Sequence, residues 1–559
     1  MVSLSRTDGG LAGSVPSMRG RLVLFSVLLL GCPKAIPDGR EGQATSGDRG
    51  TAEERLLRAR VDSIDAEAGV VLGAIDDALW RHWTRGEALD LSKASLGHEA
   101  LFGAPTVEAL RRARTLGVEA RRAAHLEHWI LGELLSRALA TDTEAIASLE
   151  AGATFTVDNK EVAWRELPRL LISEKSALKR RELAAAAVTV AERLDGLLAH
   201  REDKAAQYLA ELSAGSPQAL ALATRDVELE SLAATAREVL AGTDERWRET
   251  LVALSDLELK LPLEALTKAD LPRLLRVPAA VDALFPRATV APRALDTLAG
   301  LGLYGRAGMS FELADGATKK PLSLTVAPSP RDVRVCFKPL GGLRDQTQLL
   351  SEIGVALALS AASTGHPSTD RLGDPARATS LGLVLAGLVS EPQWLAARGI
   401  GAPQQAGVIR AARALQLYAV RRAALGVLLH AETAGLTDQD AKAAAVALEA
   451  RALGVKVAPE EGAAFRLELD DGLRSATYLK AALAAADQRE RLQERFWVSP
   501  DAGRELLGRW ASGTSVEVAV SPGAAEALVR TLGGGAQGQS VSPVPDAGLL
   551  GPSDGGAPR

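Results

Sequence analysis

Glu352 is the only charged residue in the apolar stretch 349–357, which reads LLSEIGVAL. A carboxylate in such a stretch can act as a general base, act as an acid, or be a buried structural group. Its neighbour Ser351 offers a hydroxyl nucleophile, but the two side chains point in different directions if the stretch is a helix. Because a lone carboxylate hydrolyses little without a metal to position water, we favour a structural or ligand-contacting role for Glu352.

The same stretch has the spacing of the zinc-peptidase motif His-Glu-x-x-His, but it lacks both histidines. Ser351 and Val355 stand at the two ligand positions, and Glu352 stands at the position of the general base. Residues i and i+4 share one helical face, so two imidazoles there could hold one zinc ion. Serine is a poor zinc ligand and valine is none, so most of a structural site's roughly 10–16 kcal/mol of binding energy should be lost.

The remaining histidines offer few replacement ligands. His366 lies in a Gly-His-Pro loop after the stretch, and the next histidine is His430; zinc rescue by these two is one alternative. His125 and His128 are three residues apart with Glu127 directly before the second, which is not a zincin pattern. We expect this second pair to lie on a solvated helix face.

Composition favours a large helical protein. The chain has 559 residues, 47% hydrophobic and 4% aromatic, with a net charge of −5. This length allows two or three domains or one large helical body, and an excess of Ala and Leu over aromatics favours packed helices. The acidic balance, without a long basic run, argues against nucleic acid as a partner.

The N-terminus predicts a lipid anchor. A basic segment after Met18 is followed by the apolar run 22–30 and then by Gly31-Cys32, which resembles a bacterial lipoprotein signal with Cys32 as the lipidated residue. Met18 fits the start of such a signal better than Met1. Pro33 after the cysteine favours the outer membrane, so we expect an envelope protein facing the periplasm and anchored to the membrane by acyl chains. With Cys32 lipidated, Cys336 is left as a structural thiol on a strand.

Periodicity and turn residues divide the chain into five segments. We predict a signal peptide over 1–32, a flexible tether over 33–52, a helical region over 53–280, a second helical region over 281–515 and a disordered tail over 516–559. Small β elements are expected as a hairpin around Asp158-Asn159 and as strands over 321–326 and 332–337. Apolar spacing predicts helices over 52–85, 106–140, 174–214, 216–251, 376–389, 402–433, 438–453, 475–496 and 500–512.

Several segments, taken in order, resemble the thimet oligopeptidase and oligoendopeptidase F group of zinc metallopeptidases. The resemblance covers roughly residues 53 to 515 and is weakest in the first half. The strand Arg334–Pro339, followed by Gly341-Gly342, looks like the edge strand beside the substrate cleft of the family. The other segments that carry the resemblance are the stretch around Glu352, Arg371-Leu372-Gly373-Asp374, Glu391–Leu395, Asp471–Leu479 and Trp497–Gly503.

The resemblance implies a mainly α, two-lobed gluzincin-like fold with a small β element beside the former active-site helix. It also implies that Thr379 occupies the position of the third zinc ligand, a glutamate in the family, so that Ser351, Val355 and Thr379 replace all three ligands. Arg474 stands where the family often has a substrate-facing tyrosine, and Tyr478 follows it; with Glu352 as a vestigial base, these residues are expected to line one cleft.

Two functions of different class follow. The first is a lipid-anchored pseudopeptidase, without metal or catalysis, that binds peptides or a partner protein through the old cleft. The second is an active hydrolase, either a zinc oligopeptidase with non-standard ligands or an enzyme with new chemistry. A helical envelope scaffold without a ligand is a third reading. The loss of the three ligand residues favours the first.

Overall fold

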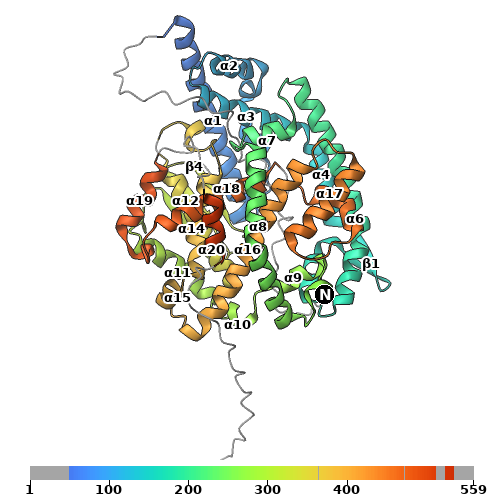
Figure 1. Ribbon diagram of the computed structural model, residues 1–559. Coiled ribbons are helices and arrows are strands. Elements are labelled where there is room, and N and C mark those ends of the chain that lie inside the picture. The colour runs from blue at the N-terminus through green and yellow to red at the C-terminus, as the bar shows by residue number, and fades with distance from the viewer. Residues whose placement is uncertain (1–49, 363, 471, 512–522, 534–559) are drawn as a thin grey trace, which may run out of the picture.

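The computed structural model describes residues 50–362, 364–470, 472–511 and 523–533, and these form a mainly helical protein with two small sheets (Figure 1). The predicted mainly α class is therefore confirmed. The signal peptide, Cys32 and most of the tether lie outside the described residues. Within the described part of the chain, no helix combines the length and the apolar character that crossing a bilayer requires.

The N-terminal helices follow the predicted periodicity with one break. Helix α1 spans Ala52–Arg85 as predicted and begins with a capping box between Thr51 and Glu54. The predicted helix 106–140 is divided into α2 (Ala104–Thr115) and α3 (Ala120–Ala138). Gly117, with φ of +71°, turns the chain between them because glycine tolerates this left-handed backbone.

The predicted hairpin is confirmed and precedes the long helices. Helix α4 (Ala140–Gly152) leads into β1 (Thr154–Val157) and β2 (Lys160–Ala163), joined by Asp158 and Asn159, which both have positive φ. Short α5 (Leu167–Ser173) and long α6 (Ala177–Glu211) follow. The predicted helix 216–251 is again two helices, α7 (Pro217–Ala223) and α8 (Leu229–Glu258).

Three short helices and a three-stranded sheet precede helix α12 in the chain. After α9 (Leu271–Leu274), α10 (Ala279–Asp282) and α11 (Arg287–Gly300), β3 (Met309–Glu312) pairs in parallel with β5 (Asp332–Cys336), and β4 (Leu324–Ser329) pairs with β5 in the antiparallel sense. Strand β3 was not predicted. Helix α12 (Leu343–Ala361) starts after Gly342, whose φ is +97° and whose added Cβ would lie 2.7 Å from Asp282 Oδ1.

Eight α-helices, with three 3-10 helices between them, complete the described chain. They are α13 (Pro367–Asp370), α14 (Ala376–Ala386), α15 (Pro392–Ala397), α16 (Ala402–Glu432), α17 (Asp438–Leu453), α18 (Arg474–Arg491), α19 (Pro500–Trp510) and α20 (Ala524–Gly533). The prediction of a disordered tail over 516–559 is wrong for α20, because its apolar side chains Ala524, Ala527, Leu528 and Leu532 are buried. Glycine and proline around α20 masked this short apolar period in the sequence.

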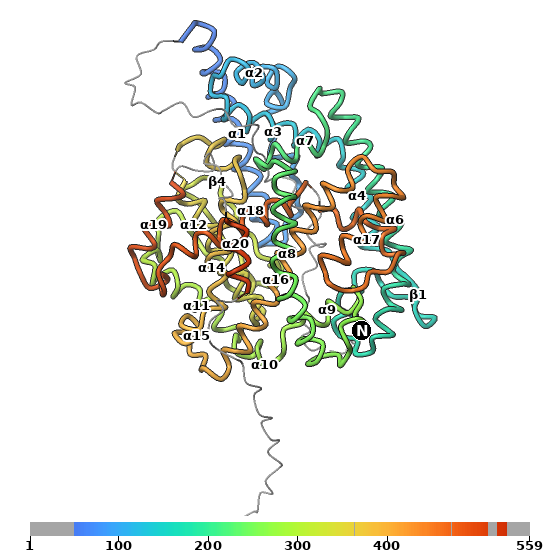
Figure 2. Tube along the Cα trace, viewed as in Figure 1, coloured from blue at the N-terminus to red at the C-terminus, as the bar shows by residue number. Residues whose placement is uncertain are grey.

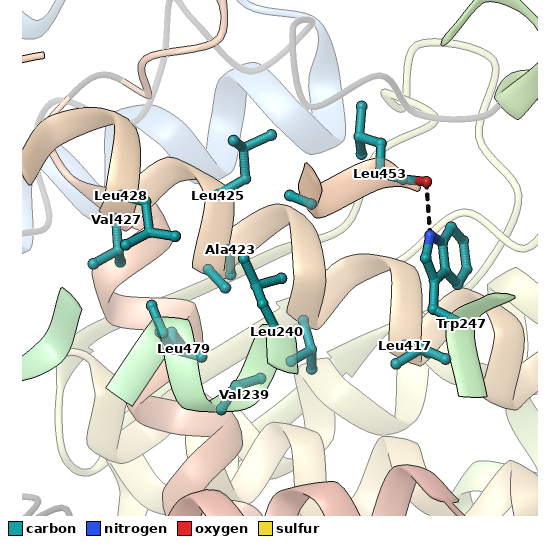
Figure 3. Close-up of a cluster of buried hydrophobic side chains, with 14 of the residues drawn as sticks. Val239, Leu240, Trp247, Leu417, Ala423, Leu425, Val427, Leu428, Leu453 and Leu479 are labelled. Atoms are coloured by element: carbon teal, nitrogen blue, oxygen red, sulfur yellow. Dashed lines mark hydrogen bonds between the residues drawn. The ribbon is translucent and has the colours of Figure 1, made fainter. Parts of the chain in front are cut away.

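The cores join the two predicted helical regions. One core combines α8 with α16, α17, α18 and α20; within it the Trp247 indole nitrogen donates a 2.7 Å hydrogen bond to the Leu453 carbonyl (Figure 3). Another combines α1, α2 and α3 with residues of β4 and β5. Figure 2 traces α1 from one end of the molecule to β4. Residues on both sides of position 280 thus share these cores.

Candidate functional site

Ser351 and Val355 lie on the face of α12 that packs against α14. The two helices approach closely at Gly354 and Gly382: a Cβ added at Gly354 would lie 2.5 Å from the Leu381 carbonyl oxygen. A Cβ added at Gly382 would lie 3.0 Å from Ser351 Oγ and 3.2 Å from Val355 Cγ2. Ser351 and Val355, the two positions expected to correspond to zinc ligands, therefore fill the helix junction by direct packing.

Thr379 lies one turn before Gly382 on α14, so it shares the Gly382 face of that helix. Its hydroxyl donates a 2.9 Å hydrogen bond to the Pro375 carbonyl of its own helix. Of the three positions expected to face one another, the structure brings Ser351 and Val355 onto Gly382 and places Thr379 a turn away. None of the three side chains supplies the nitrogen, sulfur or carboxylate donor that zinc prefers.

Glu352 points away from α14 and toward β4 and the segment before it. Ser323 and Thr325 donate hydrogen bonds of 2.6 Å to its Oε1 and Oε2, respectively. Gln348, one turn earlier on α12, donates a 2.7 Å hydrogen bond to Oε1. Both carboxylate oxygens are therefore engaged by neighbouring side chains, and the group joins helix α12 to the sheet.

The sheet presents a different edge from the one expected. Strand β5, which contains Arg334 and Cys336, is central in the order β3-β5-β4, so the expectation of an edge strand there is wrong. Strand β4 is at the edge, and α1 covers it: the Ala327 amide donates a 2.9 Å hydrogen bond to Asp76, and the Trp83 indole donates one of 2.8 Å to the Leu322 carbonyl. The α1 contacts protect an edge that could otherwise pair with another strand.

Arg474 and Tyr478 both lie on α18, but Tyr478 does not share a cleft with Glu352. Arg474 is the first residue of α18 and is partly buried. Tyr478 faces α14, α16 and α20 and lines a small hollow there, and burial raises the pKa of its hydroxyl to about 12. Glu352 and Tyr478 therefore face different neighbours, and the expectation that Arg474 lines a cleft stays a prediction.

The candidate replacement ligands His366 and His430 pair with different aspartates. His366 Nδ1 lies 3.4 Å from Asp65 Oδ2, and His430 Nε2 lies 3.1 Å from Asp470 Oδ1. Burial alone would raise the pKa of Asp470, but His430 and the Ser475 amide together hold it below the ordinary value. Each histidine thus has its own aspartate partner.

His125 and His128 are buried, so the expected solvated face is wrong. Nδ1 of His125 lies 2.7 Å from the Ser368 carbonyl oxygen, and burial lowers the pKa of this imidazole to about 4. Burial also lowers the pKa of His128 to about 3. Glu127 between them forms ion pairs with Arg111 and Arg114. Both imidazoles are neutral at pH 7 and belong to the packing around α3.

Sequence reasoning missed a set of buried ion pairs at the approach to α14. Lys480 Nζ lies 2.8 Å from Asp374 Oδ2, and the two side chains are 6% and 2% exposed. Arg371 Nη2 lies 2.7 Å from Asp76 Oδ2. Burial raises the pKa of Asp76 even though Arg371 opposes the shift. The only available signal was that two of these charges, Arg371 and Asp374, flank Leu372-Gly373 in an otherwise apolar neighbourhood.

Across the described ranges, no three His, Cys, Asp or Glu side chains gather in a way that could hold a metal ion. Cys336 is buried on β5 as predicted, and burial raises the pKa of its thiol to about 11, which makes it a poor nucleophile. Comparison with known protein families finds no match, and comparison with curated proteins finds none either.

Proposed function

We propose that the protein is a lipid-anchored, catalytically inactive relative of the thimet oligopeptidase group that binds peptides or a partner protein in the bacterial envelope. The membrane contact would be made by acyl chains on Cys32, in the outer membrane facing the periplasm. The two-lobed gluzincin-like arrangement is part of this proposal.

The hydrogen bonding of Glu352 is the observation that carries the proposal. A general base must be free to accept a proton from a water that a metal holds. Here Ser323, Thr325 and Gln348 occupy both oxygens of Glu352 and tie it to the strand side of α12. These hydrogen bonds support a structural role for Glu352, at the position where the family has its general base.

The α12–α14 junction supports the same reading. Ser351 and Val355 pack on Gly382, so the native side chains at these two positions fill the helix junction and supply no zinc donor to it. The alternative of an active zinc enzyme would need other donors, and the two candidate histidines are each paired with a separate aspartate.

Metal content and hydrolysis test the absence of catalysis. The chain 33–559 should carry less than about a tenth of an equivalent of zinc after mild purification, because its three ligand positions hold no zinc donor. It should not cleave a quenched fluorescent peptide library with or without added zinc. Near one equivalent of zinc, lost in His366→Ala, together with cleavage would establish the zinc oligopeptidase instead.

Restoring the ligands tests the resemblance itself. The triple variant Ser351→His, Val355→His and Thr379→Glu should bind about one equivalent of zinc if these positions correspond to the family's three ligands. The matched control moves the carboxylate by one residue, as Ala378→Glu, and turns it about 100° around α14. Zinc binding that is equal in the two variants, or missing in both, would contradict the assignment of Thr379.

Binding of peptides is tested at Arg474, whose guanidinium suits a terminal carboxylate. A library of octapeptides with free C-termini should be retained by the chain 33–559, and Arg474→Ala should reduce retention. Arg491→Ala at the other end of α18 is the control, because that side chain is 58% exposed and pairs with Asp487. Retention that is unchanged in Arg474→Ala contradicts its role, and a library that is not retained at all favours the scaffold reading.

A further inference from the structure

Helix α20 is a short element held in a groove between longer helices. Its ten residues pack on α8 and α18 beside α14 and α16 (Figure 1). Within α20, the side chains of Ala524, Ala527, Leu528 and Leu532 are buried. It follows α19 through residues 512–522. The groove therefore already holds one amphipathic helix, and its shape can be read from that occupant.

The groove is built from small residues at helical spacing. Along α18, the lining residues Tyr478, Ala482, Ala485, Ala486 and Arg489 recur on one face, and the alanines leave room for an incoming helix. On α8, Gly242 forms a notch for Val529 of α20. A Cβ added at Gly242 would lie 2.8 Å from Val529 Cγ2.

The contacts that hold α20 are modest. Two of its four buried side chains are alanines, and an isolated helix of this length is unstable in water. At the rim, Arg530 donates to Glu490 at 2.9 Å, but these side chains are 59% and 42% exposed, so the pair contributes at most about 1 kcal/mol. Packing of Leu528 and Leu532 must supply most of the docking energy.

The fit of α20 is also incomplete. A hollow remains between α20 and the floor of the groove, lined by Leu383, Gln416, Val420, Tyr478 and Thr531. The Thr531 hydroxyl donates back to the Ala527 carbonyl of its own helix at 2.9 Å, so it does not reach across. No described residue forms a hydrogen bond with the Tyr478 hydroxyl at the same hollow. A helix with a larger side chain at the Thr531 position would fill this space.

We propose that this groove is a docking site for an amphipathic helix of a partner protein and that α20 is its exchangeable internal occupant. The partner helix carries leucine-like residues at the positions of Leu528 and Leu532, a cation opposite Glu490, and a side chain larger than threonine at the position of Thr531. Recognition of this kind places an apolar helical face in a groove and reads residues at i, i+3, i+4 and i+7. The inference concerns α8, α18 and α20 and does not depend on the proposed loss of metal chemistry.

Peptides added in trans test the proposal. The probe is a fluorescein-labelled peptide of residues 523–533 with uncharged, blocked termini, in which Arg530 stays free to pair with Glu490. We expect it to bind a chain that ends at Ala511 at least ten-fold more tightly than the full chain, where α20 competes. The peptide with T531L should bind more tightly than the native sequence, and the peptide with L528A at least ten-fold more weakly.

A shortened chain that keeps a cooperative unfolding transition but does not bind the peptide would overturn the proposal. If removal of α20 unfolds the chain, hydrogen exchange of the full chain decides instead. Amides of α20 should then exchange at least a hundred-fold faster than those of α18, and the T531L peptide should speed their exchange further. Exchange of both helices at one common rate would show that α20 is a permanent part of the core.

Discussion

Small residues form both the α12–α14 and the α18–α20 junctions. At the first they allow two backbones to pack closely, and at the second they form a groove that holds a short helix. At the first, Gly354 and Gly382 bring two backbones together, and Ser351 and Val355 seal the contact. At the second, alanines of α18 form a trough in which α20 lies above an unfilled hollow. The glycines let α12 and α14 pack without a gap, whereas the alanines of α18 leave a groove from which we propose that α20 can be displaced.

The difference follows from the kind of side chain that anchors each helix. Helix α14 is fixed through Asp374, which pairs with Lys480, and α12 is fixed through Glu352 and the sheet. Helix α20 has one exposed rim pair and its apolar face. A helix with buried polar anchors cannot leave without breaking those ion pairs and hydrogen bonds, but a helix held mainly by its apolar face can.

The largest expected effect compares two leucines with the same burial. Leu357 on α12 is 0% exposed and Leu528 on α20 is 1% exposed. Leu357→Ala should lower the free energy of unfolding by about 2–5 kcal/mol, because it leaves a cavity in a permanent core. Leu528→Ala should lower it by less than half as much, because the chain can release α20 and stay folded. Urea unfolding of both variants, followed by circular dichroism, measures the two losses.

Equal losses would break the comparison, because they would place α20 in the same cooperative unit as α12. Hydrogen exchange provides the control: Leu528→Ala should speed exchange only in α20, and Leu357→Ala should speed it across α12 and α14. An unchanged denaturant slope in both variants would show that each retains one native state.

The α12–α14 contact itself is tested by Gly354→Ala. The added methyl would lie 2.5 Å from the Leu381 carbonyl oxygen, so the helices must separate, at a cost of roughly 1–3 kcal/mol. Gly196→Ala is the matched control, because no atom lies within 4 Å of its added Cβ on helix α6. Gly196→Ala should raise the free energy of unfolding by roughly 0.5–1 kcal/mol, because alanine has a higher helix propensity than glycine. A stabilising effect at both positions would mean that the junction is loose.

The sequence predicted most long elements because their apolar spacing is regular. The bounds of α1 and α17 match the prediction, and the turn residues Asp158-Asn159 mark the hairpin. Breaks inside long apolar periods were missed at Gly117 and before α8, because periodicity continues on both sides of a short turn. Helix α20 was missed because ten residues between Pro522-Gly523 and a glycine-rich stretch carry little statistical weight beside composition.

It was harder to predict which element each face of α12 packs against than to predict the helix itself. Periodicity places Ser351, Val355 and Glu352 on α12, but only the tertiary packing decides that two of them face α14 and the third faces β4. The separation of Tyr478 from Glu352 likewise depends on how α18 is turned, which no local pattern encodes. Buried partners such as Asp374 and Lys480 are more than 100 residues apart, so the sequence gives no sign of their pairing.

Glu352→Gln tests whether the carboxylate is structural. The substitution keeps the shape of the side chain but removes the negative charge that Ser323, Thr325 and Gln348 donate to, and it should cost about 1–2 kcal/mol of unfolding free energy. Glu505→Gln on the exposed side of α19 is the control and should cost almost nothing. A Glu352→Gln variant with unchanged stability would reopen a role for this carboxylate in chemistry.

Tyrosine titration distinguishes the closed groove from the open one. In the folded chain burial raises the pKa of Tyr478 to about 12 from an ordinary 10, so the folded state holds this proton longer than the unfolded state. The stability that depends on the neutral phenol is therefore complete below pH 10 and is lost as the pH rises from 10 to 12. A chain that ends at Ala511 should titrate Tyr478 closer to 10, measured by phenolate absorbance with Tyr478→Phe to assign the signal.

The smallest expected effect is that of Arg530→Gln at the rim of the groove. Because Arg530 and Glu490 are both well exposed, water and salt screen their attraction, and the opening free energy of α20 should fall by no more than about 0.5 kcal/mol. Arg504→Gln on α19, which removes another exposed pair, should leave α20 unchanged. Hydrogen exchange of α20 at low and high salt measures both. If Arg530→Gln opened α20 as much as Leu528→Ala, charge rather than apolar packing would hold the helix, and a partner would have to compete through ion pairs.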